Sequence, residues 1–526
     1  MPWWESAVIY QVYPRSFQDT DDNGVGDLNG ITGRLSYLVT LGVDAVWISP
    51  IFRSPMADFG YDISDYVDID PVFGNMRDFD RLIAEAHERR IRVVLDFVPN
   101  HSSDQHPWFV ESRGSRSSPK RDWYIWRDPA PGGGPPNNWL SEFGGSAWEF
   151  DEASGQYYYH AFLRSQPDLN WRNPEVAEAM CEVLRFWMRK GVDGFRVDVI
   201  WHLIKDAGFR DNPPNPSYRE GRAPHEALVP LNTTDLPEVH DIIAMLRRTI
   251  EEFPDRLLIG EIYLPVERLV AYYGRDLGGV HLPFNFALLN VRWEAKCIQS
   301  LIDEYEGALP KGGWPNWVLG NHDRPRIASR VGKRQAGVAA MLLLTLRGTP
   351  TIYYGDELAM PQVEIPRDRV CDPFERNVPG IGVGRDGCRT PMQWDAGENS
   401  GFSNVEPWLP LADGWQTNNV ACLRNEPLSI WNLYRRLLQV RRKTPALSVG
   451  SYRSVRVDKD LLVYFREHED VRLLIALNLT DIPQVLTFDQ GASGKILVST
   501  GGDRDGETVV DSIELGDDEG LIIELR

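Results

Sequence analysis

The stretch "IRVVLDFVPNH", residues 91–101, decides the fold. Its run of Val, Leu and Phe, without alternating polar residues, is typical of a strand buried on both faces, as in a parallel sheet. Seven further short runs have the same character and stand in this order: "AVIYQVYP" from Ala7, "DAVWISP" from Asp44, "GVDGFRVDVI" from Gly191, "RLLIGEIY" from Arg256, "VHLPFNF" from Val280, "PNWVLGNHD" from Pro315 and "GTPTIYYG" from Gly348.

Segments of helical period separate most of these strands. One predicted helix passes through Ile31, Leu35 and Leu38, a second buries Phe79, Leu82, Ile83 and Ala86, and a third over residues 175–190 carries Met180, Cys181, Leu184 and Trp187 on one stripe. Eight strand–helix units predict an α/β protein built on a closed (β/α)8 barrel. An open, doubly wound sheet is the alternative, but it needs fewer units and usually a glycine fingerprint after a strand, which we do not find.

The domain organisation follows from where this alternation is interrupted. We predict a first part of the barrel over residues 1–101, an inserted loop-rich domain over 102–173, and the second part of the barrel over 174–443. An irregular insertion occupies about 361–426. Alternating segments from 444 to 526 predict a C-terminal antiparallel β-sandwich.

Composition narrows the possible partners. The 526 residues carry a formal charge of −20, which repels phosphate backbones, so we expect no nucleic-acid binding. The 18 tryptophans favour carbohydrate, because an indole stacks on the apolar face of a sugar ring. No apolar run is long enough for a transmembrane helix, the first residues do not resemble a signal peptide, and five scattered cysteines suit a reducing compartment. We therefore expect a cytoplasmic protein with no membrane partner.

Polar and charged residues recur where the predicted strands end, which in such a barrel is the catalytic end. They are Asp96, Asn100 and His101 after the third strand, Arg196 and Asp198 after the fourth, Glu261 after the fifth, and His322 and Asp323 after the seventh. Carboxylates from different strands suit glycoside hydrolysis, in which one is a nucleophile and another a proton donor. Arg196 shares a strand face with Asp198 and would hold that carboxylate ionised. A metal site or structural ion pairs are the alternative.

Several motifs resemble one enzyme family. "DFVPNH", "GFRVDV", "GEIY" and "GNHDR" look like the four signature regions of the α-amylase family, glycoside hydrolase family 13. "QPDLNW" from Gln166, "FGYDISDY" from Phe59 and "RTPMQWD" from Arg389 resemble the oligo-1,6-glucosidase and α-glucosidase subfamily. The resemblance covers nearly the full length of the chain. It implies that Asp198 is the nucleophile, Glu261 the general acid/base, and Asp323 the residue that stabilises the distorted sugar.

The same resemblance implies the substrate-binding residues. His101, Arg196 and His322 would grip the glucose whose bond is cut, and Tyr61 would stack under it. Asp58 would pair with Arg389, close the pocket around the non-reducing end and make the enzyme exo-acting. Phe143 and Phe162 would line the entrance, with buried packing as the alternative. Val199, the residue after the nucleophile, favours α-1,6 over α-1,4 bonds.

The segment "FQDTDDNGVGDLNG", residues 17–30, begins like a calcium-binding EF-hand loop. An EF-hand needs a bidentate Glu at position 12, and counting from Asp19 that position is Gly30, so a calcium sensor is excluded. The family resemblance implies instead a loop that holds one structural ion through the side chains of Asp19, Asp21, Asn23 and Asp27 and the carbonyl of Val25. Oxygen ligands suit Ca²⁺ first and Mg²⁺ second. A solvated acidic turn is the alternative.

Three functions compete on these observations. The first is a retaining exo-α-glucosidase that releases glucose from short α-glucosides of the maltose, isomaltose or sucrose type. The second is a transglucosylase or sugar isomerase that hands the same glucosyl unit to an acceptor other than water. The third is a non-catalytic barrel subunit of a transporter, which would carry a membrane helix and lack the carboxylates. We expect a small α-glucoside as partner and a monomer or homodimer.

Overall fold

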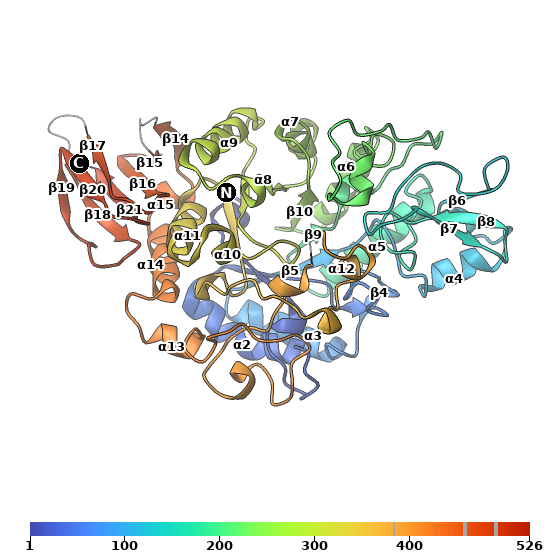
Figure 1. Cartoon of the computed structure of the whole chain (residues 1–526), viewed down its shortest axis with the longest axis horizontal. Helices are drawn as coiled ribbons and strands as arrows, with labels where there is room; N and C mark the ends of the chain where they lie inside the picture. The colour runs from blue at the N-terminus through green and yellow to red at the C-terminus, as the bar shows by residue number, and fades with distance from the viewer. Residues whose placement is uncertain (382–383, 456–459, 489–492, 526) are drawn as a thin grey trace.

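A computed structural model describes residues 1–381, 384–455, 460–488 and 493–525, so residues 382–383 of the predicted insertion over 361–426 lie outside it. Its centre is a closed parallel barrel whose strands are hydrogen-bonded in the order β1–β2–β5–β9–β10–β11–β12–β13 (Figure 1). These strands are β1 (Ile9–Val12), β2 (Ala45–Ile48), β5 (Arg92–Phe97), β9 (Gly194–Val197), β10 (Leu257–Ile262), β11 (Leu282–Asn285), β12 (Asn316–Val318) and β13 (Thr349–Tyr353). They coincide with the eight predicted runs, so the predicted barrel is confirmed and the open sheet is wrong.

The helices that cover the barrel include α2 (Leu28–Leu41), α3 (Met76–Glu88), α5 (Pro174–Arg189), α6 (Val239–Glu251), α9 (Ala295–Ala308) and α11 (Ala336–Thr345). Helices α2, α3 and α5 bury the faces that the sequence pattern predicts for them. Helix α3 starts at a capping box, in which Asn75 accepts from the helix backbone and Asp78 accepts from the Asn75 amide. Its buried residues are the predicted four. Among the helices of the described residues, none is both long and apolar enough to cross a membrane.

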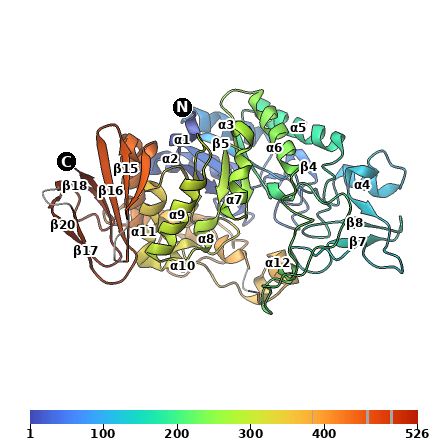
Figure 2. The same ribbon diagram turned by 90° about the horizontal axis from the view of Figure 1, so that it is seen from above.

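Two irregular regions extend from the catalytic end of the barrel. Between β5 and α5 lie helix α4 (Pro107–Gly114) and a small antiparallel sheet of β6 (Trp126–Arg127), β8 (Gln156–Tyr159) and β7 (Trp148–Asp151), which project to one side in both ribbon views (Figures 1 and 2). Between β9 and α6 the chain forms only the 3₁₀ turns η3 (Ile200–His202) and η4 (Pro224–Ala227). This β9–α6 loop, residues 198–238, was not singled out by the sequence pattern.

The C-terminal region is antiparallel, as predicted, but its strands are hydrogen-bonded to one another in a single sheet. Helix α14 (Ile430–Lys443) and the short α15 (Pro445–Ser448) lead into it. The order runs through β14 (Ser451–Val455), β15 (Leu461–His468), β16 (Val471–Asn478), β21 (Gly520–Leu525), β18 (Ser493–Ser499), β19 (Thr508–Val510), β20 (Ser512–Leu515) and β17 (Gln484–Thr487). One face encloses a core that includes Val463, Ile496 and Leu515, so the sheet curls over itself; the other face joins the main core of the molecule.

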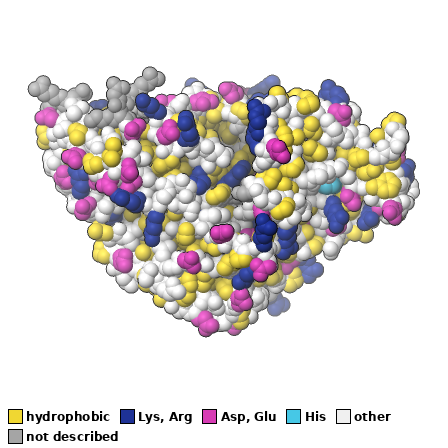
Figure 3. Space-filling model, viewed as in Figure 1, with side chains coloured by type: hydrophobic (Ala, Val, Ile, Leu, Met, Phe, Trp, Pro, Cys, Tyr) yellow, Lys and Arg dark blue, Asp and Glu magenta, His cyan; other side chains and the backbone are white. Residues whose placement is uncertain are grey.

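Charged side chains of both signs are interspersed on the face drawn in Figure 3, which has no continuous basic stripe. All five cysteines carry free thiols.

Candidate active site

The predicted catalytic residues meet at the C-terminal ends of the barrel strands. Asp198 follows β9, Glu261 lies in β10, and His322 and Asp323 follow β12. They line one cavity of about 740 Å³. Ten of the twelve residues predicted for catalysis, substrate binding or specificity line it: Asp58, Tyr61, His101, Phe143, Phe162, Asp198, Val199, Glu261, His322 and Asp323. The other two, Arg196 and Arg389, are buried behind it.

Arg196 holds the carboxylates together. Its Nη1 donates to Asp96 and to Asp198, both at 2.8 Å, and its Nη2 lies 2.7 Å from Glu261 Oε2. The side chain is completely buried. The contact with Asp198 that strand periodicity predicts is confirmed. Its guanidinium contacts three carboxylates from β5, β9 and β10, and its implied contact with glucose stays a prediction.

Asp198 and Glu261 form an electrostatically coupled pair. Burial and the charge of Glu261 raise the pKa of Asp198, and burial raises the pKa of Glu261. The backbone N–H of Val199 donates to Glu261 Oε2 at 2.9 Å. Val199 adopts a left-handed conformation with φ of 34°, which is strained for a β-branched residue. Two carboxylates that repel in this way hold one proton between them, which is what an acid and a nucleophile need.

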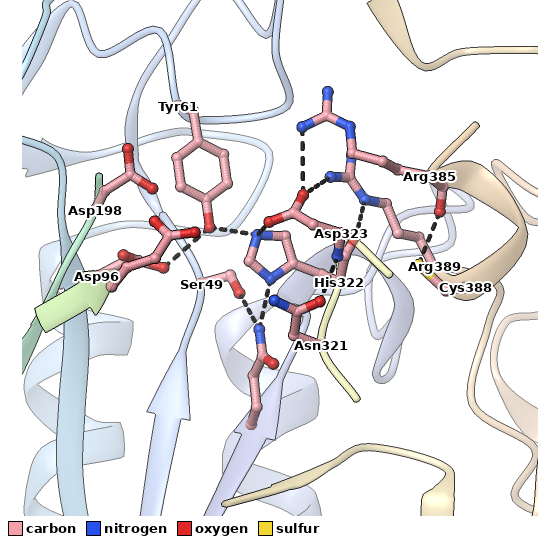
Figure 4. Close-up of polar contacts among 12 residues, drawn as sticks. Ser49, Tyr61, Asp96, Asp198, Asn321, His322, Asp323, Arg385, Cys388 and Arg389 are labelled. Atoms are coloured by element: carbon pink, nitrogen blue, oxygen red, sulfur yellow. Dashed lines mark hydrogen bonds and ion pairs between the residues drawn. The ribbon is translucent and has the colours of Figure 1, made fainter. Parts of the chain in front are cut away.

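Asp323 has the opposite electrostatics. Its Oδ1 accepts from Arg389 Nη2 at 2.9 Å and from Arg385 Nη1 at 3.3 Å, and Figure 4 shows both guanidinium groups beside it. Burial disfavours its charge, but His322 and the two arginines outweigh this and bring the pKa of Asp323 well below its usual range. Asp323 is therefore a fixed negative charge at the inner end of the cavity.

His322 and Tyr61 form a rigid inner wall. Their rings are stacked with centroids 5.5 Å apart, and Tyr61 Oη lies 2.6 Å from His322 Nε2 (Figure 4). Gln11 Nε2 lies 2.7 Å from His322 Nδ1, and because an amide nitrogen donates, Nδ1 accepts and the proton sits on Nε2. Burial lowers the pKa of His322 to about 3, so the ring is neutral. Tyr61 Oη also donates to Asp96 at 3.0 Å.

The acidic residue at the closed end has a different partner from the one predicted. Asp58 Oδ1 pairs with Arg385 Nη2 at 2.7 Å, and their side chains are only 6% and 12% exposed. Arg389 is fully buried and donates to Asp323 and to the carbonyl of His322 instead. The predicted Asp58–Arg389 pair is therefore wrong. The two arginines stand four residues apart in "GRDGCRTPMQWD", and sequence alone does not tell which one reaches Asp58.

The remaining predicted residues lie around the cavity. His101 Nε2 is 3.2 Å from Gln166 Nε2, and its ring lies 5.1 Å from that of Phe162. Phe143 and Phe162 both line the cavity, and their rings pack against each other with centroids 5.7 Å apart. Their roles in binding substrate stay predictions.

Sequence reasoning missed a large part of the cavity wall. The β9–α6 loop supplies His202, Asn212, Asn215, Arg222, Ala223, His225, Glu226 and Thr233, and the inserted region adds Glu142. The signal was available in "DNPPNPSYREGRAPHEAL", residues 211–228, which is a long aperiodic stretch after a barrel strand. Loops at that end of a barrel carry binding residues.

The acidic loop near the N-terminus brings three carboxylates together. Oxygens of Asp19, Asp21 and Asp27 lie within 4.8 Å of one another. Hard oxygen donors at this spacing fit Ca²⁺. Asn23 Oδ1 accepts from the Val25 amide at 2.8 Å, and the parts of these two residues as ligands stay predictions. Asp27 also caps α2 by accepting from Gly30.

A (β/α)8 barrel that carries these carboxylates at the C-terminal ends of its strands has the architecture of a glycoside hydrolase. Residues 11–450 match the model of the alpha-amylase catalytic domain, so the chain belongs to the alpha-amylase family of glycoside hydrolases. It is 44% identical to a probable alpha-glucosidase of Rhizobium meliloti, over 91% of this chain and 90% of that protein. It is 40% identical to an oligo-1,6-glucosidase of Heyndrickxia coagulans, covering 93% and 94%. A crystal structure of an alpha-glucosyl transfer enzyme superposes with a TM-score of 0.95 at 39% identity and full coverage of both chains.

Proposed function

We propose that this protein is a retaining, exo-acting α-glucosidase that releases terminal glucose from short α-glucosides. The observation that carries the proposal is the shared guanidinium of Arg196, which keeps Asp198 and Glu261 close together. Retaining glycosidases hold their two carboxyl groups about 5–5.5 Å apart, whereas inverting ones leave room for a water between them. The buried Asp58–Arg385 pair lines the cavity and supports the exo mode, because such a pair would close the site around a single terminal sugar.

The proposed reaction has two steps. In the first, Asp198 attacks the anomeric carbon, the glycosidic bond breaks, and Glu261 gives its proton to the departing oxygen. In the second, Glu261 takes a proton from water, the water oxygen attacks the anomeric carbon, and the bond to Asp198 breaks to free glucose. The ionised Asp323 and neutral His322 would hold the ring hydroxyls while positive charge develops.

Two features bear on the substrate and the acceptor. Val199 lines the cavity next to both carboxylates, which supports a preference for α-1,6 bonds such as that of isomaltose. Transfer to a sugar in place of water is the second candidate, and the similarity to an alpha-glucosyl transfer enzyme favours it. Both routes share the first step.

Product analysis tests the proposal. The protein is incubated separately with maltose, isomaltose, sucrose and trehalose, and the sugars are chromatographed over time. Free glucose as the main product at low substrate supports hydrolysis, and the fastest substrate names the bond. New di- or trisaccharides with little free glucose would assign the protein to transfer. No conversion of any of the four would contradict the proposal.

We also propose that the acidic loop binds one structural Ca²⁺ through Asp19, Asp21 and Asp27, with Asn23 and Val25 completing the site. The loop docks on the insertion, since the Ser403 hydroxyl donates to Asp19 at 2.6 Å and Asn404 donates to Asp22 at 2.8 Å. The ion would supply charge balance for carboxylates that otherwise repel. A cytoplasmic location is proposed from the free thiols.

A further inference from the structure

An ion pair in the wall of the cavity joins two regions that are distant in sequence. Glu142 comes from the inserted region and His225 from turn η4 of the β9–α6 loop, and both line the cavity. Their side chains are 32% and 25% exposed, against 9% for Asp198 and 5% for Glu261. The pair is therefore more exposed than Asp198 and Glu261 and about as exposed as Asp323, whose side chain is 24% exposed.

The geometry requires His225 to be charged. Its Nε2 lies 2.9 Å from the Glu142 carboxylate and its Nδ1 lies 3.1 Å from the Glu142 carbonyl oxygen. Both oxygens only accept hydrogen bonds, so both ring nitrogens must carry a proton. This makes a two-point, charge-assisted contact with a single residue of the inserted region.

A small apolar cluster reinforces the same junction. Phe143, Ala223 and Phe374 are buried together, and they come from the inserted region, the β9–α6 loop and the insertion over 361–426. The rings of Phe143 and Phe374 lie 5.5 Å apart. Three chain segments thus meet beside the Glu142–His225 pair, and the pair supplies the charged contact of that junction.

We propose that the Glu142–His225 ion pair narrows the cavity where the inserted region meets the β9–α6 loop and thereby makes this protein prefer disaccharides to longer α-glucosides. The proposal rests on the proposed α-glucosidase function and adds a determinant of substrate length. A third sugar would have to pass between the two segments that the pair holds together. Breaking the pair lets the β9–α6 loop move away from the inserted region, so longer substrates gain access.

This narrowing depends on pH. Burial disfavours the charge on His225, but Glu142 outweighs this and raises the pKa of His225; Glu226, paired with Arg222 on the same turn, acts in the same direction. His202 faces Glu142 from the end of β9 and is neutral, because burial lowers its pKa to about 4. A raised histidine pKa means that the ion pair is complete below the ordinary value of about 6.5 and is lost as pH rises through the raised value.

The test compares kcat/KM for a trisaccharide and a disaccharide of the same linkage, such as isomaltotriose and isomaltose. Both substrates use the same catalytic groups, so their ratio cancels the pH dependence of the chemistry itself. In the wild-type protein we expect the trisaccharide-to-disaccharide ratio to rise between pH 5.5 and pH 8.5. This series needs no variant, and a ratio independent of pH would overturn the proposal.

His225→Gln and Glu142→Gln test the pair directly, since each keeps the approximate size of the side chain. We expect either variant to raise the ratio about threefold or more at pH 5.5 and to remove its dependence on pH. The double variant should add little to either single change, because the two residues act through one contact. An unchanged ratio in both single variants would overturn the proposal.

His87→Gln is the matched control. His87 lies on helix α3, and its Nε2 is 2.8 Å from the carboxylate of Asp193. Neither residue is among those that line the cavity, so the trisaccharide-to-disaccharide ratio of this variant should follow that of the wild type. Thermal unfolding of each variant verifies that it is folded. A wild-type protein that releases no glucose from either substrate would instead refute the proposed function, and the inference with it.

Discussion

Arg196 is the residue on which the charge balance of the site depends. One guanidinium faces Asp96, Asp198 and Glu261, so the local charge stays negative even with Arg196 protonated. A negative site stabilises the positive charge that develops on the sugar ring in the transition state. Asp323 adds a second negative charge that Arg385 and Arg389 keep ionised.

Asp198→Asn removes the proposed nucleophile without changing the size of the side chain. We expect kcat/KM to fall by at least about a thousandfold, because neither step proceeds without the covalent intermediate. Steady-state kinetics on isomaltose and a thermal unfolding curve are the measurements. The unfolding midpoint should stay near that of the wild type, and near-normal hydrolysis by this variant would refute the assignment.

Val199→Thr tests the proposed linkage preference. Val199 lines the cavity between the two carboxylates, so a hydroxyl introduced there meets the leaving sugar. We expect activity on maltose to increase relative to isomaltose, by about twofold to tenfold, which corresponds to roughly 0.4–1.4 kcal/mol. The measurement is the ratio of kcat/KM for the two disaccharides; an unchanged ratio would remove the specificity role of this residue.

Arg385→Lys tests the contact between Arg385 and Asp58. Arg385 contacts Asp58 at 2.7 Å and Asp323 at 3.3 Å. A lysine keeps the positive charge but lacks the planar guanidinium that reaches two carboxylates at once. We expect KM for isomaltose to rise by about tenfold with a smaller change in kcat, since the pair shapes the inner end of the cavity. Initial-rate kinetics measure both constants. A KM within twofold of the wild-type value would contradict the proposed role of the Asp58–Arg385 pair.

For individual residues, the sequence predicts which ones belong to the site better than it predicts which side chains they contact. Strand periodicity alone places Arg196 beside Asp198, and the contact is present. Nothing local distinguishes Arg385 from Arg389, because the choice depends on how an irregular segment folds back over β12.

Among the elements, strands were predictable and loops were not. The barrel strands are buried on both faces, so most of their residues are apolar and the sequence shows near-continuous apolar runs. The β9–α6 loop has no period, so its contribution to the cavity depends on tertiary contacts such as the Glu142–His225 pair. The C-terminal strands were also recognisable, but their alternation cannot tell two sheets from one curled sheet.

Removal of the proposed Ca²⁺ would affect how the acidic loop packs against the insertion over 361–426. The acidic loop contacts the insertion that carries Arg385, through Ser403 and Asn404. We expect a chelator to lower the unfolding midpoint by several degrees, because an ion bound only to the folded state stabilises it by mass action. Calorimetry with and without added Ca²⁺ measures the shift. Asp21→Asn should reduce the response to Ca²⁺, and a midpoint that neither chelator nor Ca²⁺ moves would exclude the site.

Over the whole molecule, five parts of the chain build one cavity on a barrel whose interior is filled by side chains. The barrel ends supply the catalytic carboxylates, while the segment between β2 and α3, the inserted region, the β9–α6 loop and the insertion over 361–426 supply the walls. The C-terminal sheet packs against the main core, and none of its described residues lines the cavity. Chemistry and selectivity are therefore carried by different parts of the chain.

Capture of the covalent intermediate tests the central claim most directly. The protein is treated with a fluorinated glucosyl fluoride, which forms the glucosyl-enzyme faster than water releases it, and is then digested and analysed by mass spectrometry. The proposed mechanism predicts one glucosyl adduct, located on the peptide that contains Asp198 and absent from the Asp198→Asn variant. An adduct on another residue, or release of glucose with inverted anomeric configuration, would contradict it.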